Sequence, residues 1–475
     1  MFFVSNSLFN NIFCLLVITF KPKYATIKVE EYYMYNYDVI IVGAGTAGTY
    51  FSYLLGKRGL KVLVIDKDSE KNLAKRLDIF HFTTQSFARF NLPESKAGDP
   101  EFVSKFSYIY SRSALDNYEK KNFLEVHVMH LPLFIQRLRN KALKEGVEFR
   151  FSTEFKGLLY DDKQRINGIE TKAEEKIRAR LVVDASGIPS VVRTVVKDPY
   201  MENFPIGPRD KFYVFLKYVK LKDPKVKIDM SLSWPYYKGW IAPQQNKDGA
   251  IVGVGANISV DYARKCMKKF EDSIKLPEYT LQYEEWGATP YRRPPYSFVT
   301  DGFLVLGDAA CLTQPMNGEG ITSAWVQSTP AADIVAEALK DRKYPTKEAL
   351  WPINVMYQTG EGAEFAGQRA LLVGAVNMTK ADNDYLYANG IIFKSDDEEV
   401  KGSVAGNLIK GVLKGKFTLA ALRSLMRASG TGNKLTKHYK KYPTTPEGYL
   451  NWKKRADCLW KKAGSMADNV KDAEE

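Results

Sequence analysis

The sequence predicts an α/β protein in which a Rossmann-like nucleotide-binding domain carries an inserted antiparallel β-sheet domain and a C-terminal helical region. Three observations predict this fold class. Residues 37–68 run from an apolar segment through a glycine-rich turn and a helical pattern to a second apolar segment, the order of strand, loop, helix and strand. Two later apolar runs, within 178–187 and 303–308, each end in an aspartate. Between them, 211–221 and 249–260 alternate in polarity, which is typical of antiparallel strands with one buried face.

The glycine-rich turn after the first strand, GAGTAG, has the spacing of a pyrophosphate-binding loop. Gly43 allows the tight turn, Gly45 lets the backbone approach the phosphates, and Gly48 lets the helix pack close to the sheet. Ala47 belongs to the same loop, and the helix start points its free N–H groups at the phosphates. Asp66 ends the second strand, where its carboxylate would accept hydrogen bonds from ribose hydroxyls. The turn therefore predicts a dinucleotide site.

Two later motifs follow apolar strands in the same way. Asp184 and Gly187 form a sharp turn that would lie against a ribose or a pyrophosphate. Gly307 and Asp308 close the last apolar run, and the Asp308 carboxylate would hydrogen-bond a ribityl hydroxyl. Each pair alone carries little information, but their order along the chain indicates three parts of one flavin site.

The stretch after Asp308 prepares the start of another helix. Pro315 bends the chain, and Gly318 and Gly320 bracket Glu319 just before the helix. Backbone N–H groups at that start would face the pyrimidine end of an isoalloxazine ring. The helix dipole there favours a negative charge by roughly 0.3–1 kcal/mol, and the anionic reduced flavin carries such a charge.

Taken together, the three motifs resemble the FAD-binding superfamily typified by para-hydroxybenzoate hydroxylase, over about residues 36–345. Within that superfamily the pattern GDAA…P…GEGI…A, which includes Ile321, is most similar to the geranylgeranyl reductase family. The chain looks like a divergent archaeal-type member. The resemblance implies bound FAD, whose reduced form hydrogenates isolated double bonds of polyprenyl chains in isoprenoid lipids or prenyl diphosphates.

The family's substrate-side motif has Pro, Tyr, Trp and Phe at offsets 0, 3, 5 and 7. This chain has Pro235, Lys238, Trp240 and Ala242 at those positions, so Pro and Trp match while Tyr and Phe are replaced. The resemblance makes Trp240 and Glu319 the candidate catalytic residues. Two other departures are the lack of a cysteine in the loop after the second strand and Leu131 where many relatives have a flavin-contacting Arg.

Reduction of an isolated alkene also needs a proton donor. The sequence offers Glu319 from the late motif, His81 from an apolar run, and Cys311, which directly follows GDAA. His81 is more often a core residue in such a context, and Cys311 a packing residue. The sequence alone does not choose among the three.

The motifs divide the chain into four parts, with residues 1–33 interpreted as an upstream extension. The other parts are a discontinuous FAD-binding domain (34–75, 120–200 and 290–345), a substrate-binding domain (76–119 and 201–289) and a basic helical region (346–475).

Composition limits the kinds of partner and compartment. The best candidate for a membrane span, 8–20, has thirteen residues, whereas a spanning helix needs about 20. The four cysteines and four histidines show no metal-ligand spacing, which predicts no metal site and weakly indicates a cytoplasmic setting. The net charge of +14 is concentrated between Lys401 and Lys462, where 15 Lys and Arg face 2 Asp and Glu.

This basic region flanks an apolar-rich stretch at 407–427, for which core packing and docking on a membrane surface are equally compatible with the sequence. The residues that could share a helical stripe are Leu408, Val412, Leu419, Leu422 and Met426. We expect a peripheral contact with the inner face of the membrane rather than a nucleic-acid partner.

Three functions remain open at this point. A prenyl reductase would take electrons from ferredoxin or from transiently docked NAD(P)H, because no second nucleotide-binding unit is visible in the sequence. A flavin monooxygenase or halogenase of the same superfamily is the second; halogenases have Trp-x-Trp-x-Ile-Pro where this chain has KGWIAP at 238–243. The third is a membrane-surface flavoprotein that reduces a quinone.

Overall fold

The computed structural model describes residues 35–74, 78–115, 117–223, 238–244, 248–375, 378–396, 398 and 403–464. The predicted extension at 1–33 and Pro235 of the substrate-side motif lie outside the described residues.

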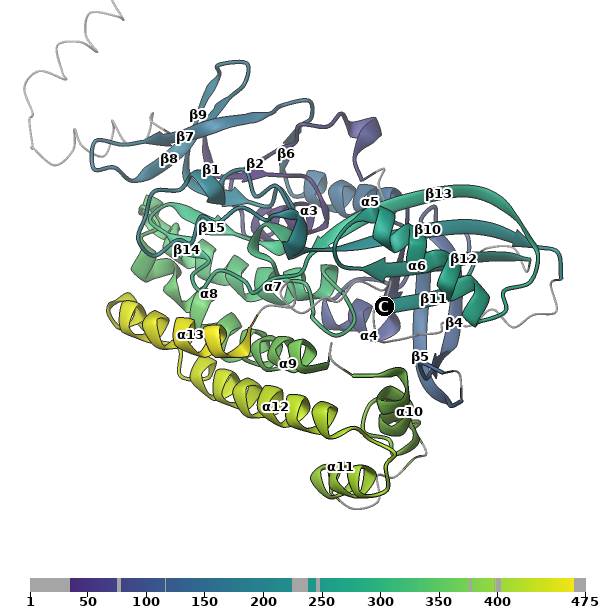
Figure 1. The fold of residues 1–475 in the computed structure, drawn as a ribbon. Coiled ribbons are helices and arrows are strands. Elements are labelled where there is room, and N and C mark those ends of the chain that lie inside the picture. The colour runs from purple at the N-terminus through teal and green to yellow at the C-terminus, as the bar shows by residue number, and fades with distance from the viewer. Residues whose placement is uncertain are drawn as a thin grey trace, which may run out of the picture.

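A parallel sheet forms the centre of the FAD-binding domain (Figure 1). Its strand order is β14-β15-β9-β1-β2-β6, with an antiparallel extension through β7 and β8. The strands are β1 (Tyr37–Val42), β2 (Val62–Ile65), β6 (Glu148–Arg150), β7 (Phe155–Tyr160), β8 (Ile166–Thr171), β9 (Lys176–Asp184), β14 (Val299–Thr300) and β15 (Phe303–Val305). The central strands are almost entirely apolar because both faces are covered. The predicted α/β class is confirmed.

Three helices pack around this sheet and one another: α3 (Thr46–Gly56), α5 (Leu131–Lys144) and α7 (Ile321–Ala338). Helices α3 and α7 are locked together by aromatic stacking, since the rings of Tyr50 and Trp325 lie 4.2 Å apart, centroid to centroid. The Trp325 indole also donates to the Thr46 carbonyl at 3.1 Å. The starts of the two helices are therefore held close to each other.

Two antiparallel sheets lie beside the FAD-binding domain. The four-stranded sheet has the order β11-β12-β10-β13, and the three-stranded sheet has the order β3-β5-β4. Their elements are β3 (Ile79–Thr83), α4 (Thr84–Arg89), β4 (Phe102–Arg112), β5 (Glu119–His130), β10 (Lys211–Leu221), β11 (Lys238–Pro243), β12 (Gly249–Ala256), α6 (Val260–Ser273) and β13 (Tyr279–Pro290). Helix α6 covers one face of the larger sheet, and the other face packs on the smaller sheet. The domain boundary drawn at residue 120 falls inside the β4–β5 pairing, which the structure shows as one hairpin.

The C-terminal region is helical, as the sequence predicts. It contains α8 (Lys347–Thr359), α9 (Glu361–Ala375), α10 (Lys380–Ala388), α11 (Val404–Leu413), α12 (Leu419–Tyr439) and α13 (Tyr449–Ala463). Short 3-10 turns lie at Glu70–Asn72, Arg193–Val195, Pro208–Asp210, Gly307–Ala310, Lys340–Arg342 and Pro446–Gly448. Among the described residues, no helix is both long enough and apolar enough to cross a membrane.

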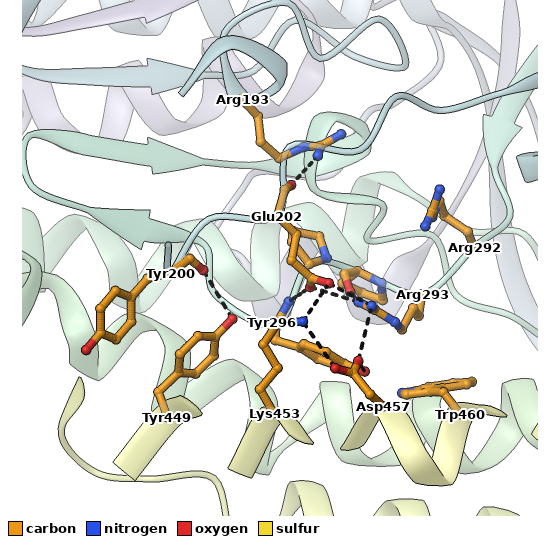
Figure 2. A network of polar contacts seen from close by, with 12 residues as sticks. Arg193, Tyr200, Glu202, Arg292, Arg293, Tyr296, Tyr449, Lys453, Asp457 and Trp460 are labelled. Atoms are coloured by element: carbon orange, nitrogen blue, oxygen red, sulfur yellow. Dashed lines mark hydrogen bonds and ion pairs between the residues drawn. The ribbon is translucent and has the colours of Figure 1, made fainter. Parts of the chain in front are cut away.

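Helix α13 is fixed to the FAD-binding domain by a polar network around the buried part of Glu202 and Arg293 (Figure 2). Glu202 pairs with Arg293 at 2.7 Å and with Lys453 of α13 at 3.5 Å. The Tyr296 hydroxyl donates to Asp457 at 2.8 Å. Burial alone would raise the pKa of Glu202, but the hydrogen bonds and charge of Arg293 outweigh it and hold the pKa below its ordinary value. The carboxylate therefore stays ionised and keeps the network closed.

Candidate functional site

The first glycine loop is shaped by backbone crowding. Gly43 has a φ of 111°, and a Cβ built there would lie closer than 3.0 Å to the carbonyl oxygen of Ala185. A Cβ on Gly48 would lie equally close to the Gly43 carbonyl oxygen. By contrast, a Cβ built on Gly45 would have no heavy atom within 4 Å. The chain thus closes on two of the glycines and leaves open space at the third.

Asp66 lies at the end of β2, directly beside this loop. One carboxylate oxygen accepts from the Ala44 N–H at 2.7 Å, and the other accepts from the Asp68 N–H at 2.9 Å. Asp66 therefore holds the loop, and its contact with a ribose stays a prediction.

The middle motif packs on the first loop, and its aspartate is used within its own turn. The buried Asp184 carboxylate accepts from backbone N–H groups of Ser186, Val192 and Arg193 and from two serine hydroxyls. Its role in this structure is to shape the turn that presses Ala185 against Gly43. A Cβ built on Gly187 would have no heavy atom within 4 Å, so there is open space at the end of the turn.

The late motif meets the first loop at Gly307. This residue has a φ of 60°, and a Cβ there would lie 2.8 Å from the Ala47 Cβ on α3. The neighbouring Asp308 carboxyl hydrogen-bonds Thr313, but burial dominates and raises its pKa to about 6. The motif therefore places a desolvated carboxyl beside the starts of two helices.

The stretch from Gln314 to Ile321 forms a pinned turn before α7. The Gln314 N–H donates to the Glu319 carbonyl at 2.8 Å, and the Gly318 N–H donates to the Gln314 carbonyl at 2.9 Å. A Cβ built on Gly318 would have no heavy atom within 4 Å, and a Cβ on Gly320 would meet Asp308 at 3.3 Å. Glu319 contributes to this turn through its backbone, and its carboxylate accepts from Asn317 at 3.3 Å.

The turn is also held from the larger antiparallel sheet. The hydroxyls of Thr289 and Thr313 lie 2.5 Å apart, and the Tyr291 hydroxyl donates to the Pro315 carbonyl at 3.4 Å. The end of β13 therefore lies directly against the late motif.

Two buried arginines also hydrogen-bond the late motif, and sequence reasoning gave neither of them a role. Arg193 donates to the Ala309 carbonyl at 3.0 Å, and Arg369 of α9 donates to the Thr313 carbonyl at 3.4 Å. Cys311 lies between them in a left-handed conformation with a φ of 56°. Burial raises the pKa of the Cys311 thiol to about 12 despite these cations, so the thiol stays protonated and is a poor acid.

One face of the larger sheet carries Trp240. Side chains alternate along a strand, so the register places Lys238 and Trp240 of β11 on the same face as Gly255 and Gly253 of β12. The Trp240 indole occupies the space above Gly253 that a Cβ would fill. Ala242, where the family has Phe, is buried farther along the strand against the three-stranded sheet.

Lys238 is the functional candidate that the motif comparison noted only as a departure. Burial, with no charged neighbour among the described residues, lowers its pKa to about 8. A lysine in such surroundings is a proton donor near neutral pH. The pairing of β11 with β12 shows that Lys238 shares a sheet face with Trp240.

Two other titratable side chains also lie near these elements. Burial lowers the pKa of His81 to about 4, so the ring is neutral at pH 7, and its Nε2 atom has no hydrogen-bond partner among the described residues. Burial raises the pKa of Glu361, the first residue of α9, to about 7, and the charge of Glu319 adds to this shift. Glu361 is thus a second acid that sequence reasoning missed.

Comparison with known proteins defines the class. A family model described as an FAD binding domain matches residues 36–346. The chain belongs to this family and is an FAD-dependent oxidoreductase, as the three motifs predict.

The relatives are reductases and halogenases. The digeranylgeranylglycerophospholipid reductase of Sulfolobus acidocaldarius is 23% identical over 441 residues, covering 89% of this chain and 97% of the relative. A 1H-pyrrole-2-carbonyl-(peptidyl-carrier protein) brominase of Pseudoalteromonas luteoviolacea is 24% identical and covers 66% of this chain and 80% of the relative. The predicted resemblance to geranylgeranyl reductases is confirmed.

Solved structures agree on the fold. A geranylgeranyl bacteriochlorophyll reductase-like protein from Thermoplasma acidophilum aligns with a TM-score of 0.67 at 17% identity, over 85% of this chain and 99% of that chain. A flavin-dependent brominase aligns with a TM-score of 0.55 at 18% identity, over 89% of this chain and all of that chain.

The residues present fit the FAD that the family binds. The helices α3 and α7 begin at Gly45 and Gly320 without a side-chain cap, so their first N–H groups remain available to a ligand. The positions at Gly45, Gly187 and Gly318 are open. The loops that carry them contact one another, Gly43 against Ala185 and Gly307 against Ala47.

Proposed function

We propose that this enzyme hydrogenates isolated C=C bonds in the polyprenyl chains of isoprenoid lipids or prenyl diphosphates. The observation that carries the proposal is the sheet face bearing Trp240, on which aromatic rings lie over the glycines of β12. It belongs to the same sheet whose β13 end is bonded to the late motif. The name of the Sulfolobus relative, which acts on a digeranylgeranyl glycerophospholipid, supports this substrate class.

Each part of the site has a separate task in this proposal. Reduced FAD supplies the hydride. The open positions at Gly45 and Gly187 would hold the pyrophosphate and ribose, with Asp66 and Asp184 fixing the loops that form them. Asp308 would bind the ribityl chain, and the start of α7 at Gly320 and Ile321 would lie at the pyrimidine end.

The substrate would lie along the face of the larger sheet. Trp240 and Phe212, whose rings lie over Gly253 and Gly255, would provide an aromatic wall for a prenyl chain. Pro315, Gly318 and Glu319 would border this space from the late motif, which contacts the sheet at the end of β13. The aromatic wall is largely apolar, which suits a prenyl chain without polar groups.

Lys238 is the proposed proton donor to the carbon that does not receive the hydride. Its ammonium shares the face with Trp240 and has no competing partner among the described residues. Cys311 is too weak an acid, and the neutral His81 has no readily lost proton. Glu361, beside Glu319, is the alternative donor.

Electrons would come from outside the chain. The described residues contain one βαβ unit of the dinucleotide-binding type, formed by β1, α3 and β2, and FAD would occupy it. Ferredoxin or transiently docked NAD(P)H is the proposed donor. A lipid substrate also implies a cytoplasmic protein with peripheral membrane contact.

The test of the function is anaerobic turnover. The holoenzyme, reduced with dithionite, is mixed with a detergent-dispersed digeranylgeranyl glycerophospholipid, and the lipid is followed by mass spectrometry. The expected product gains two hydrogens for each bond reduced. If every polyprenyl lipid offered keeps its mass while the flavin is fully reduced, the proposal fails.

Lys238→Met tests the proton donor. We expect hydrogenation to fall by roughly 100-fold, a typical contribution of a general acid, with FAD content and dithionite reduction unchanged. Activity of the unmodified enzyme should decline above pH 8, where Lys238 loses its proton, and the variant should lack this decline. Glu361→Gln is the matched control; if it alone abolishes the pH dependence, Glu361 is the donor.

A halogenase or monooxygenase function is the second candidate, favoured by the brominase relative. Lys238 and Ala242 stand where halogenases have Trp and Ile, which argues against it. Oxygen-dependent transfer of bromide or oxygen to an aromatic substrate would favour this function. Reoxidation of the reduced flavin by a quinone, without hydrogenation of a lipid, would instead indicate the quinone reductase.

A further inference from the structure

Helices α11 and α12 expose a group of large apolar side chains. Leu413, at the end of α11, is 82% exposed, and Met426 of α12 is 63% exposed. Val404, Ile409 and Leu419 are also about half exposed. We call these five residues, together with the lysines and arginines between residues 403 and 427, the α11–α12 surface. Scattered exposed apolar residues are common, but five within 23 positions form a patch.

The exposed residues are not needed for packing. The opposite sides of the same helices already form a core in which Leu408 and Leu422 are buried with Phe417. The sequence stripe therefore divides: Leu408 and Leu422 point inward, Val412 is partly buried, and Leu419 and Met426 face solvent. Each helix therefore has two apolar sides. Among the described residues, one side packs in the core and the other faces solvent.

The surface carries positive charge without compensation. Residues 403–427 contain five cations and no Asp or Glu, and all five cations are exposed. They are Lys410, Lys414, Lys416, Arg423 and Arg427. Within the described part of the chain none of them forms an ion pair. An anionic bilayer presents phosphates at its surface and acyl chains below them. The cations would bind the phosphates, and the apolar residues would reach the acyl chains.

The surface is joined to the substrate-side sheets through α10. The Tyr385 hydroxyl of α10 donates to the Asn407 carbonyl of α11 at 2.7 Å. The neighbouring Asn383 and Asp384 accept from the backbone N–H groups of Ala114 and Leu115 at the tip of the β4–β5 hairpin, at 3.1 and 3.0 Å. Figure 1 shows α10 and α11 at the same end of the molecule as this hairpin. A contact at α11 is thus connected to the sheet that faces Trp240.

We propose that the α11–α12 surface docks on an anionic lipid bilayer, with Leu413 and Met426 inserted at the level of the headgroups and the five cations against lipid phosphates. The inference rests on the proposed function, because a lipid substrate gives the enzyme a reason to bind a bilayer. The contact itself follows from the exposed apolar residues and the positive charge.

Vesicle flotation of the full-length holoenzyme tests the contact without turnover. We expect binding to vesicles of equimolar phosphatidylcholine and phosphatidylglycerol, weakened by salt, and little binding to phosphatidylcholine alone. Leu413→Gln/Met426→Gln should lose binding by roughly tenfold or more. Lys410→Gln should weaken it by roughly fivefold, the effect of one charge near an anionic surface.

The controls separate the surface from general effects. Met356→Gln removes an exposed methionine on α8 and Lys268→Gln an exposed lysine on α6, and both variants should bind vesicles like the unmodified enzyme. Hydrogenation of detergent-dispersed lipid should be unchanged in all variants, so failure of the proposed function would appear in that assay and failure of docking in flotation. Equal vesicle binding by the double variant, or a dimer in light scattering that the double variant abolishes, would overturn the proposal.

Discussion

Two glycine-rich loops, one before α3 and one before α7, meet where Gly307 touches Ala47, yet their glycines serve different purposes. In the first loop, a Cβ on Gly43 or Gly48 would collide with backbone atoms. In the second, a Cβ on Gly318 would face open space, and a Cβ on Gly320 would approach only the side-chain oxygens of Asp308 and Thr313. The first loop uses glycine mainly so that chain segments can touch, and the second uses it to leave room for a ligand.

The largest effect is expected where the backbone is crowded. Gly48→Ala would force the new methyl against the Gly43 carbonyl and should lower the free energy of unfolding by about 3 kcal/mol, the upper part of the usual range for overpacking. Thermal unfolding and the flavin absorbance of the purified protein measure the loss of stability and of FAD.

Gly45→Ala is the matched control in the same loop. The open space there should keep the change in stability within about 1 kcal/mol, the effect of a poorer helix cap. FAD affinity should still fall by roughly tenfold, equivalent to about 1.4 kcal/mol. Equal destabilisation by the two variants would remove the distinction between the packed and the open glycines.

Asp308→Asn should change the stability of the FAD-free protein in a way that depends on pH. The folded-state pKa of about 6 lies above the unfolded value of 3.8, so the ionised carboxyl destabilises the FAD-free protein above pH 6 by about 3 kcal/mol. The variant should therefore be more stable at pH 7, and the gain should disappear as the pH falls towards 4. FAD should bind more weakly because a charged acceptor is lost.

Denaturant unfolding of the FAD-free protein at several pH values, together with FAD titration, measures both effects. Glu319→Gln in the same turn serves as the control, because its side chain is bonded only to the neighbouring Asn317 among the described residues. A stability gain that persists unchanged at pH 4 would contradict the assigned burial of Asp308.

The smallest effect is expected at Cys311. Cys311→Gly relieves a left-handed conformation that costs about 1 kcal/mol, and it loses a buried side chain worth a similar amount. The free energy of unfolding should change little and FAD should stay bound. Loss of FAD from the purified variant would show that this loop does not lie at the flavin.

The sequence predicts the parts of this site that depend on backbone shape. Gly43, Gly45 and Gly48 have the packed, open and packed environments that the dinucleotide motif requires. The apolar runs ending at Val42, Ile65 and Asp184 become adjacent parallel strands. These features depend on local residue order, so a single sequence carries them.

The remaining features depend on contacts between distant segments. The bracing of Thr313 by Arg369, 56 positions away, leaves no local pattern. Lys238 looks like a surface residue until the pairing of β11 with β12 places it opposite Gly255. Burial, which sets its pKa, is a property of the assembled sheets.

The buried network around Glu202 also bears on how the chain folds during synthesis. Tyr449 of α13 donates to the carbonyl of Tyr200, and the two residues are 249 positions apart. At translation rates of about 5–20 residues per second, the ribosome needs roughly 10–50 s to travel between them. During that interval Glu202 and Arg293 lack the helix that covers them, so this corner of the nascent flavoprotein is a natural place for a chaperone to act.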